Sequence, residues 1–148
     1  MSARGGYLLD TNIMLALMRA NPLGQLIETT NGLRASLNRS LISVVTVGEM
    51  LSLARQFGWG KTKTTHLEAL LNQLVWIDIN NHLILDAYGE LDHESRKVGR
   101  PMGGNDVWIA ATARVSGATL LSTDRDFDHL HGIWIDRIWI DPTSGKTP

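Results

Sequence analysis

The chain has 148 residues, of which 43% are hydrophobic and 20% charged, so it is long enough for one folded domain with its own core. Its 14 basic and 15 acidic side chains give a formal net charge of -1, which does not point to a general nucleic-acid binder but is compatible with a local basic patch. There are no cysteines, which excludes disulfides and thiolate zinc sites.

We expect a cytoplasmic protein, since the absence of cysteines is compatible with a reducing compartment. No apolar stretch approaches the length of a membrane span, and the first residues do not resemble a signal peptide. We expect a single domain over residues 1–148, in which residues 1–6 and 142–148 are flexible tails.

The first predicted element is the apolar run Tyr7-Leu8-Leu9, which stops abruptly at Asp10. We interpret it as a short buried strand that delivers a carboxylate to the end of a sheet. Thr11 or Asn12 can then cap a helix that begins near Ile13. In open α/β sheets, ligands bind beyond the carboxyl ends of the strands, so Asp10 is well placed for chemistry.

Asn21-Pro22 closes this first helix. A second short helix is predicted around residues 23–31, and residues 33–38 are ambiguous between helix and loop. The β-branched run Leu41–Val45 is predicted as the second strand. Thr46 and Glu49 have capping-box spacing, so we predict a helix from Val47 to about Phe57 with Glu49 in its first turn.

Strands and helices alternate through the rest of the chain. In order, the predicted elements are a helix at residues 64–74, a strand at 75–79, a helix at 81–98, a loop at 99–104, a helix from Asn105 or Asp106 to about Ser116, a strand at 118–122, and a last strand at 133–140 that Asp136-Arg137 interrupts. This alternation predicts an α/β domain with a parallel sheet that is covered on both faces.

Four acids share one local setting, at the end of a strand or the start of a helix: Asp10, Glu49, Asp106 and Asp124. In a parallel sheet these places lie at the same edge. Each acid taken singly is better explained as a helix cap or a first-turn acid that suits the helix dipole. Together, however, carboxylates in one cleft repel unless a cation neutralises them. Oxygen ligands without His or Cys suit Mg²⁺ or Mn²⁺, which can activate water during phosphate chemistry.

Three blocks of the chain carry a resemblance to a known family. They are Leu8–Asn12, Ile42–Glu49, and Gly104–Ala113 followed by Leu120–Phe127. In order and spacing they resemble PIN-domain proteins, and they are most similar to the VapC-type toxins of bacterial toxin–antitoxin pairs. The resemblance covers nearly the whole chain, from Tyr7 to about Ile140.

The resemblance implies a three-layer α/β/α fold with a central, mostly parallel sheet, and a metal-dependent endoribonuclease. Carried over by position, Asp10 and Asp106 hold the principal Mg²⁺ or Mn²⁺ ion. Glu49 completes the cluster as a ligand or through water, and Asp124 acts through water or a second metal. The choice of the fourth acid is open among Asp124, Asp126 and Asp128, and Asp124 is favoured because it directly follows a strand. The supporting or substrate-binding residues are Thr11, Asn12, Thr123 and Asn105.

The same resemblance implies the partners. They are an RNA substrate, a small antitoxin protein whose tail crosses the active cleft, and a second copy of the chain in a homodimer formed through helices, with no membrane involved. The apolar helix face of Ile13, Met14, Leu17 and Met18 is a candidate partner surface, although core packing explains the same residues.

Two other functions remain open. A PIN-like fold that has lost catalysis could serve as an RNA- or protein-binding module, against which the intact set of four acids argues. An aspartyl-phosphate hydrolase also begins from a strand-end Asp, but such enzymes usually place a second acid two residues on, where this chain has Asn12.

Several residues outside the acidic set have two interpretations. Arg96, Lys97 and Arg100 are either a solvated helix end or a phosphate-contacting patch, with equal support. His129 and His131 are expected to be solvated loop histidines. The tryptophans divide into those expected in the core and one expected to be exposed: Trp76, Trp134 and Trp139 in the first class, Trp59 in the second.

Overall fold

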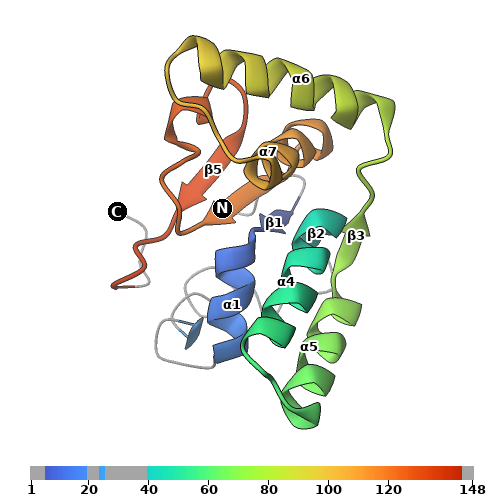
Figure 1. Ribbon diagram of the computed structural model, residues 1–148. Coiled ribbons are helices and arrows are strands. Elements are labelled where there is room, and N and C mark those ends of the chain that lie inside the picture. Colours follow the sequence, from blue (N-terminus) through green and yellow to red (C-terminus); the bar gives the residue numbers. More distant parts are fainter. Residues whose placement is uncertain (1–5, 20–23, 26–39, 145–148) are drawn as a thin grey trace.

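A computed structural model describes residues 6–19, 24–25 and 40–144 of the chain (Figure 1). Several expectations fall outside these residues. They concern Asn21-Pro22, the helix predicted around residues 23–31 except Gly24 and Gln25, the ambiguous segment 33–38, and most of the two expected tails.

The centre of the molecule is a five-stranded sheet with the order β3-β2-β1-β4-β5. All neighbouring strands are parallel, which confirms the predicted sheet. Its strands are β1 Tyr7–Leu9, β2 Leu41–Ser43, β3 Val75–Ile77, β4 Thr119–Ser122 and β5 Asp136–Trp139. In the central strand, Leu8 is in register with Leu41 on one side and Leu120 on the other.

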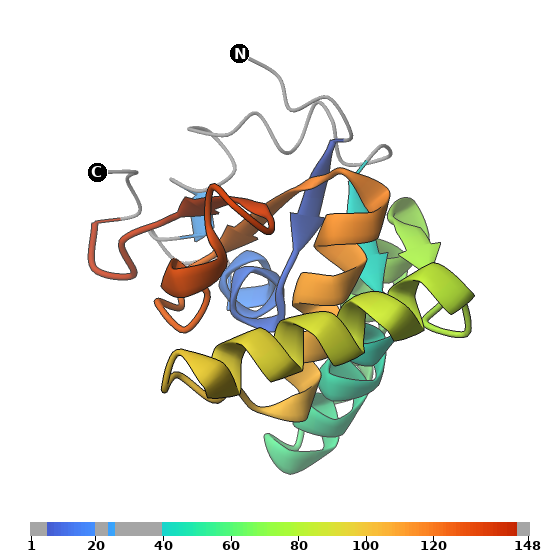
Figure 2. The same ribbon diagram turned by 90° about the horizontal axis from the view of Figure 1, so that it is seen from above.

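Helices cover both faces of this sheet. They are α1 Thr11–Arg19, α4 Val44–Gln56, α5 Lys61–Gln73, α6 His82–Lys97 and α7 Gly104–Ser116, with a short 3-10 turn, η2, at Asp128–Leu130. The views in Figures 1 and 2 show α6 and α7 together on one face, and α1, α4 and α5 on the other. The expected three-layer α/β/α architecture is therefore confirmed.

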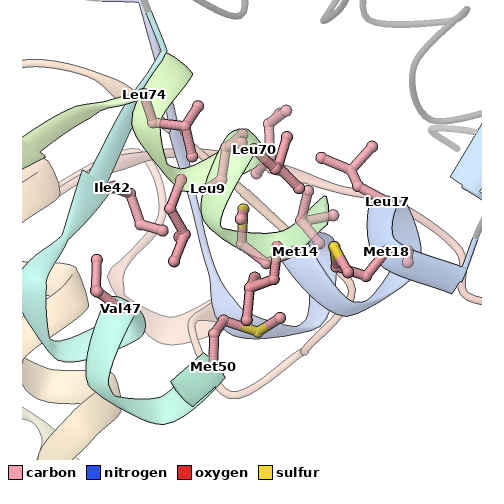
Figure 3. Close-up of a cluster of buried hydrophobic side chains, with 14 of the residues drawn as sticks. Leu9, Met14, Leu17, Met18, Ile42, Val47, Met50, Leu70 and Leu74 are labelled. Carbon is pink, nitrogen blue, oxygen red and sulfur yellow. The ribbon is translucent and has the colours of Figure 1, made fainter. Parts of the chain in front are cut away.

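Each face of the sheet has its own apolar core because side chains alternate along a strand. Leu9 packs with α1, α4 and α5, as the close-up in Figure 3 shows, whereas Leu8 packs with α6 and α7. Each fully buried large apolar side chain contributes about 1.5–3 kcal/mol of transfer free energy. The apolar face of α1, including Ile13 and Met14, is part of the first core and is not an open surface.

The first helix begins two residues earlier than predicted, and its cap is a different residue. Asp10 accepts a hydrogen bond at Oδ1 from the backbone N–H of Ile13 over 3.0 Å, which is the contact of an N-cap side chain. The helix therefore starts at Thr11, and neither Thr11 nor Asn12 is the cap. The acid that ends the strand also begins the helix.

The second strand is shorter than predicted, and the capping box at Thr46 and Glu49 is wrong. Ser43 caps α4 by accepting from the backbone N–H of Val45 over 3.1 Å, so Val44 already lies in the helix. Val44 and Val45 favour a strand locally, but the helix packs Val47 and Met50 against the core, and this packing outweighs that preference. Glu49 consequently lies one turn further into the helix than expected.

Further differences lie at the two edge strands, β5 and β3. Asp136 and Arg137 do not interrupt the last strand but begin β5, where the Arg137 guanidinium pairs with Asp128 at 2.6 Å. At the opposite edge, Trp76 in β3 is 49% exposed, so its expected core position is wrong. Trp134 and Trp139 are half-buried and only partly fulfil the same expectation.

Trp59, which was expected to be exposed, is half-buried against the first core, with the Lys63 ammonium over its ring. In the described part of the chain, no helix combines the length and the apolar character that crossing a membrane requires.

Candidate active site

The predicted acids converge at one edge of the sheet, where β1, β2 and β4 end. Asp10 follows β1, Glu49 lies on the helix after β2, and Asp124 follows β4. Asp106 enters the same region from the first turn of α7. Their mutual repulsion shows the convergence: Asp124, Asp126 and Glu49 all raise the pKa of Asp106, and Asp106 and Asp124 raise that of Asp10.

Asp10 is the most deeply buried of these acids, with 4% of its surface exposed. Besides the bond from Ile13, its Oδ2 accepts a hydrogen bond from the hydroxyl of Ser122. Burial raises its pKa from 3.8 to about 7, and the carboxylates of Asp106 and Asp124 add to the shift, against the lowering effect of its two hydrogen bonds. In the absence of a cation, this carboxylate resists ionisation near neutral pH.

Glu49 is oriented by a residue from another helix. The Thr11 hydroxyl donates to Glu49 Oε1 over 2.9 Å, which ties the first turn of α1 to the second turn of α4. Thr11 was predicted as a supporting residue, and the structure places it directly on one of the acids. The Thr11 hydroxyl bonds only Oε1 of Glu49, and Oε2 does not take part in this bond.

Asp106 occupies the first turn of α7, and the helix has no side-chain cap at Gly103. A carboxylate there is favoured by the helix dipole. Burial nevertheless raises its pKa from 3.8 to about 6, and the neighbouring carboxylates of Asp124, Asp126 and Glu49 raise it further. Burial is therefore the main cause of the raised pKa of Asp106, and the crowding of like charges adds to it.

The loop after β4 contributes two acids rather than one. Carboxylate oxygens of Asp106, Asp124 and Asp126 lie within 4.8 Å of one another. The backbone N–H of Asp126 donates to Asp124 Oδ1 over 2.9 Å, and the charge of Asp124 is the main cause that raises the pKa of Asp126. Asp128, the other acid considered, pairs instead with Arg125 and Arg137.

Ser122 is the site residue that the sequence analysis missed. It is fully buried at the last position of β4. Its oxygen donates to Asp10 and accepts from the backbone N–H of Asp124 over 2.9 Å, so one hydroxyl holds two acids in place. A serine at the end of a predicted strand, two residues before a candidate acid, is the sequence signal that could have identified it.

The other predicted supporting residues lie at the surface of the site. Asn12 and Asn105 are exposed, and Thr123 is half-buried with its carbonyl accepting from the indole N–H of Trp139 over 3.1 Å. Asn105 and Glu49 line a groove of about 460 Å³ that follows α4 as far as Gln56. The acidic edge therefore opens into a groove with a mostly uncharged lining.

A histidine and an arginine flank the acids. His129 is not a solvated loop residue as expected, because its Nε2 lies 2.8 Å from the Ser95 hydroxyl on α6, and burial lowers its pKa. The positive charge of Arg100 lowers the pKa of both His129 and Asp126, which places Arg100 beside the site. His131 is exposed, as expected.

The donor set fits a hard divalent cation. It consists of carboxylate oxygens from Asp106, Asp124 and Asp126 in mutual reach, with Asp10 and Glu49 close enough for charge coupling. Hard oxygen donors favour Mg²⁺ or Mn²⁺ over metals that prefer nitrogen or sulfur. Burial and, to a smaller extent, the neighbouring carboxylates raise the pKa of Asp10 and Asp106, so a bound cation would favour the ionised form of both acids.

Comparison with known proteins agrees with this arrangement. The family model of the PIN domain matches residues 7–133. The chain is 32% identical over 117 residues to Ribonuclease VapC1 of Haemophilus influenzae, covering 78% of this chain and 84% of that protein. It is 28% identical over 125 residues to Ribonuclease VapC2 of the same species, covering 84% and 91%.

Solved structures show the same fold. VapBC-1 from nontypeable Haemophilus influenzae superimposes with a TM-score of 0.70 and 29% identity, covering 93% of this chain and 98% of that one. DNA-bound VapBC from Salmonella typhimurium gives a TM-score of 0.75 at 21% identity, covering 88% and 95%. The chain belongs to the PIN-domain family and, within it, to the VapC branch.

Proposed function

We propose that this protein is a metal-dependent endoribonuclease that hydrolyses phosphodiester bonds of RNA and acts as the toxin of a toxin–antitoxin pair. The observation that carries the proposal is the convergence of Asp10, Glu49, Asp106 and Asp124 at one sheet edge. The similarity to proteins named ribonuclease VapC supports the reaction class.

The acids have distinct roles in this proposal. Asp10 and Asp106 would hold the principal ion, Mg²⁺ or Mn²⁺, and Asp124 would complete the set as the fourth acid. A bound ion of this kind supplies an activated water and stabilises negative charge on the scissile phosphate. The Asp126 carboxylate lies within reach of those of Asp106 and Asp124, but because it is exposed it would contribute charge at the rim of the site rather than a principal ligand.

The protein's own groups position the reactants. Ser122 and the N–H of Ile13 fix both oxygens of Asp10, so its orientation is set before substrate arrives. Thr11 fixes one oxygen of Glu49, and the other oxygen would orient the attacking water and accept its proton. The groove beside Glu49, into which Asn105 projects, would take the nucleotides next to the cleaved bond. Asn12 and Thr123 would contact the phosphate from the surface of the site.

The proposal extends to assembly and location. Structural neighbours are toxin–antitoxin complexes, which supports a small antitoxin as the partner of this chain. We propose further that the chain forms a homodimer through its helices, that its residues make up a single nuclease domain, and that it works in the cytoplasm.

An RNA cleavage assay tests the proposal. Purified wild type, Asp10→Asn and Asp106→Asn would each be incubated with total cellular RNA, with Mn²⁺ or with chelator, and the new ends mapped by sequencing. Asp86→Asn is the matched control, because Asp86 is an exposed acid on α6 away from the acidic edge.

The expected result is cleavage by wild type and Asp86→Asn only with Mn²⁺, and no cleavage by either site variant. Cleavage that survives Asp10→Asn and Asp106→Asn would contradict the site. A folded wild type that binds Mn²⁺ but cuts no RNA would favour the catalytically silent binding module.

A further inference from the structure

Arg125 lies between the two acids of the β4 loop and is stacked on an aromatic ring. Its guanidinium carbon is 3.7 Å from the ring centroid of Trp139, the last residue of β5. Trp139 is itself held, because its indole N–H donates to the carbonyl of Thr123. Trp139 is also in register with Ser122, so the stacked pair stands at the acidic edge of the sheet.

Further contacts hold the Arg125 side chain and backbone. Arg125 Nη1 lies 3.6 Å from Asp128 Oδ2, and the backbone N–H of Asp128 donates to the carbonyl of Arg125 over 3.0 Å. Phe127, two residues after Arg125, is fully buried in the core between the sheet and helices α6 and α7, and it anchors this turn. The Arg125 side chain nevertheless remains 62% exposed. A flat cation is thus held with one face on Trp139 and much of its surface in solvent.

We propose that the open face of Arg125 is a stacking platform for one unpaired base of the RNA substrate, next to the scissile bond. This inference rests on the proposed ribonuclease function and specifies one contact that would hold the RNA substrate. Guanidinium planes and aromatic rings bind splayed-out bases of single-stranded RNA by stacking. In a duplex, both faces of a base are covered by its neighbours, so this platform selects unpaired nucleotides.

Charge alone does not account for this arrangement. A phosphate contact requires only a mobile cation, whereas here the guanidinium lies over a tryptophan ring and pairs with Asp128. The position also matters, because the acids on either side of Arg125 in sequence, Asp124 and Asp126, belong to the three-carboxylate cluster. A base on this platform would bring its phosphate close to that cluster.

The chain contains a matched pair with the same chemistry at the amino ends of the strands, opposite the acidic ends. The Arg114 guanidinium lies 4.9 Å from the ring centroid of Trp134, and it is also bonded to the Trp134 carbonyl and to Glu90. These residues border a pocket with Gly117 and Ala118, just before the amino end of β4. Arg114 therefore serves as an internal control for loss of an arginine stacked on tryptophan.

The test is RNA binding by wild type, Arg125→Ala, Arg125→Lys and Arg114→Lys. The probe is a fluorescently labelled ten-nucleotide single-stranded RNA of mixed sequence, and a hairpin of the same length serves for comparison. Anisotropy is measured in chelator, so that metal-dependent cleavage does not interfere. Melting curves of each variant confirm that it is folded.

We expect both Arg125 variants to weaken binding of the single strand by about tenfold, within the range known for base stacking. Arg125→Lys keeps the charge and loses the plane, so its weakening shows that the plane matters. Arg114→Lys should bind like wild type, and wild type should bind the hairpin more weakly than the single strand.

Wild-type affinity in Arg125→Lys, or equal affinity for hairpin and single strand, would overturn the platform. The cleavage assay on total RNA is independent of this result. Metal-dependent cleavage together with an inert Arg125 would leave the nuclease standing and remove only the platform, whereas failure of wild type to bind or cut RNA would overturn both.

Discussion

The hydroxyl of Ser122 donates a hydrogen bond to the carboxylate of Asp10, which joins residues 112 positions apart in the sequence. The same oxygen accepts from the backbone N–H of Asp124, so one buried side chain couples the acid after β1 to the acid after β4. Groups that orient the ligands of a metal are typically worth 10- to 100-fold in metal affinity or activity.

Ser122→Ala is therefore expected to lower RNA cleavage by roughly 10- to 100-fold. It should also lower the free energy of unfolding by about 1–3 kcal/mol, because a buried carboxylate loses its partner. Ser116→Ala is the control, since Ser116 lies in the last turn of α7 and its hydroxyl donates only to the Ala113 carbonyl of the same helix, over 3.4 Å. Equal cleavage by Ser122→Ala and wild type would show that the Ser122 bond does not position the acids.

The bond between Thr11 and Glu49 gives a second prediction. Thr11→Val removes the hydroxyl at nearly constant volume, so Glu49 loses its orientation and cleavage should fall about tenfold. Thr11→Ser keeps the hydroxyl and should restore most of the rate. Both variants should unfold at similar denaturant concentrations, because Thr11 is only half-buried. A serine variant as slow as the valine variant would mean that the methyl group, not the bond, is important.

The loop acids differ in their surroundings, and this difference predicts which one completes the site. Asp124 is half-buried, its N–H is held by Ser122 and its Oδ1 is bonded, whereas Asp126 is exposed. Asp124→Asn should weaken Mn²⁺ binding and cleavage by about tenfold or more. Asp126→Asn should change either by less than about threefold, as expected for an exposed charge. Calorimetric titration with Mn²⁺ measures the affinities, and the reverse order would make Asp126 the fourth acid.

The buried carboxylate of Asp10 predicts how the stability of the metal-free protein depends on pH. Its pKa is raised from 3.8 to about 7 by folding, so the folded state binds a proton more tightly than the unfolded chain. This contribution to stability is complete below pH 4 and is lost as pH rises through 7. Metal-free wild type should therefore be less stable at pH 8 than at pH 5.

Asp10→Asn removes the charge that is costly to bury. In chelator at pH 8 it should be more stable than wild type, by on the order of 4 kcal/mol, since folding raises the pKa of Asp10 from 3.8 to about 7 and each pKa unit corresponds to about 1.4 kcal/mol. Mn²⁺ should stabilise wild type and not this variant. Denaturant unfolding at pH 5 and pH 8 measures these differences. If Asp10→Asn were less stable than wild type at pH 8, burial of the ionised Asp10 carboxylate would not be destabilising.

Much of this site was predictable from sequence because strand ends and parallel connections obey general rules. The apolar run before Asp10, the glycines before Asp106 and the strand before Asp124 place three acids at one sheet edge without any coordinates. The order of the elements then predicts the parallel sheet, which β1 to β5 confirm.

The features that were not predictable depend on contacts between distant residues. The valines after Ser43 favour a strand locally, but their helix packs Val47 and Met50 into the core. Arg137 can lie in a strand because Asp128, from the preceding turn, pairs with it. The role of Ser122 depends on the neighbouring strand, and no local pattern at Ser122 names Asp10 as its partner.

Metal dependence of the acidic site is tested by the rate of RNA cleavage as a function of Mn²⁺ concentration, measured for wild type and Asp106→Asn on one mapped substrate. We expect the wild-type rate to rise from zero in chelator to a plateau, and the Asp106→Asn rate to stay near zero at every concentration. A wild-type rate that is independent of Mn²⁺ and unchanged in chelator would contradict a metal-dependent site at these acids.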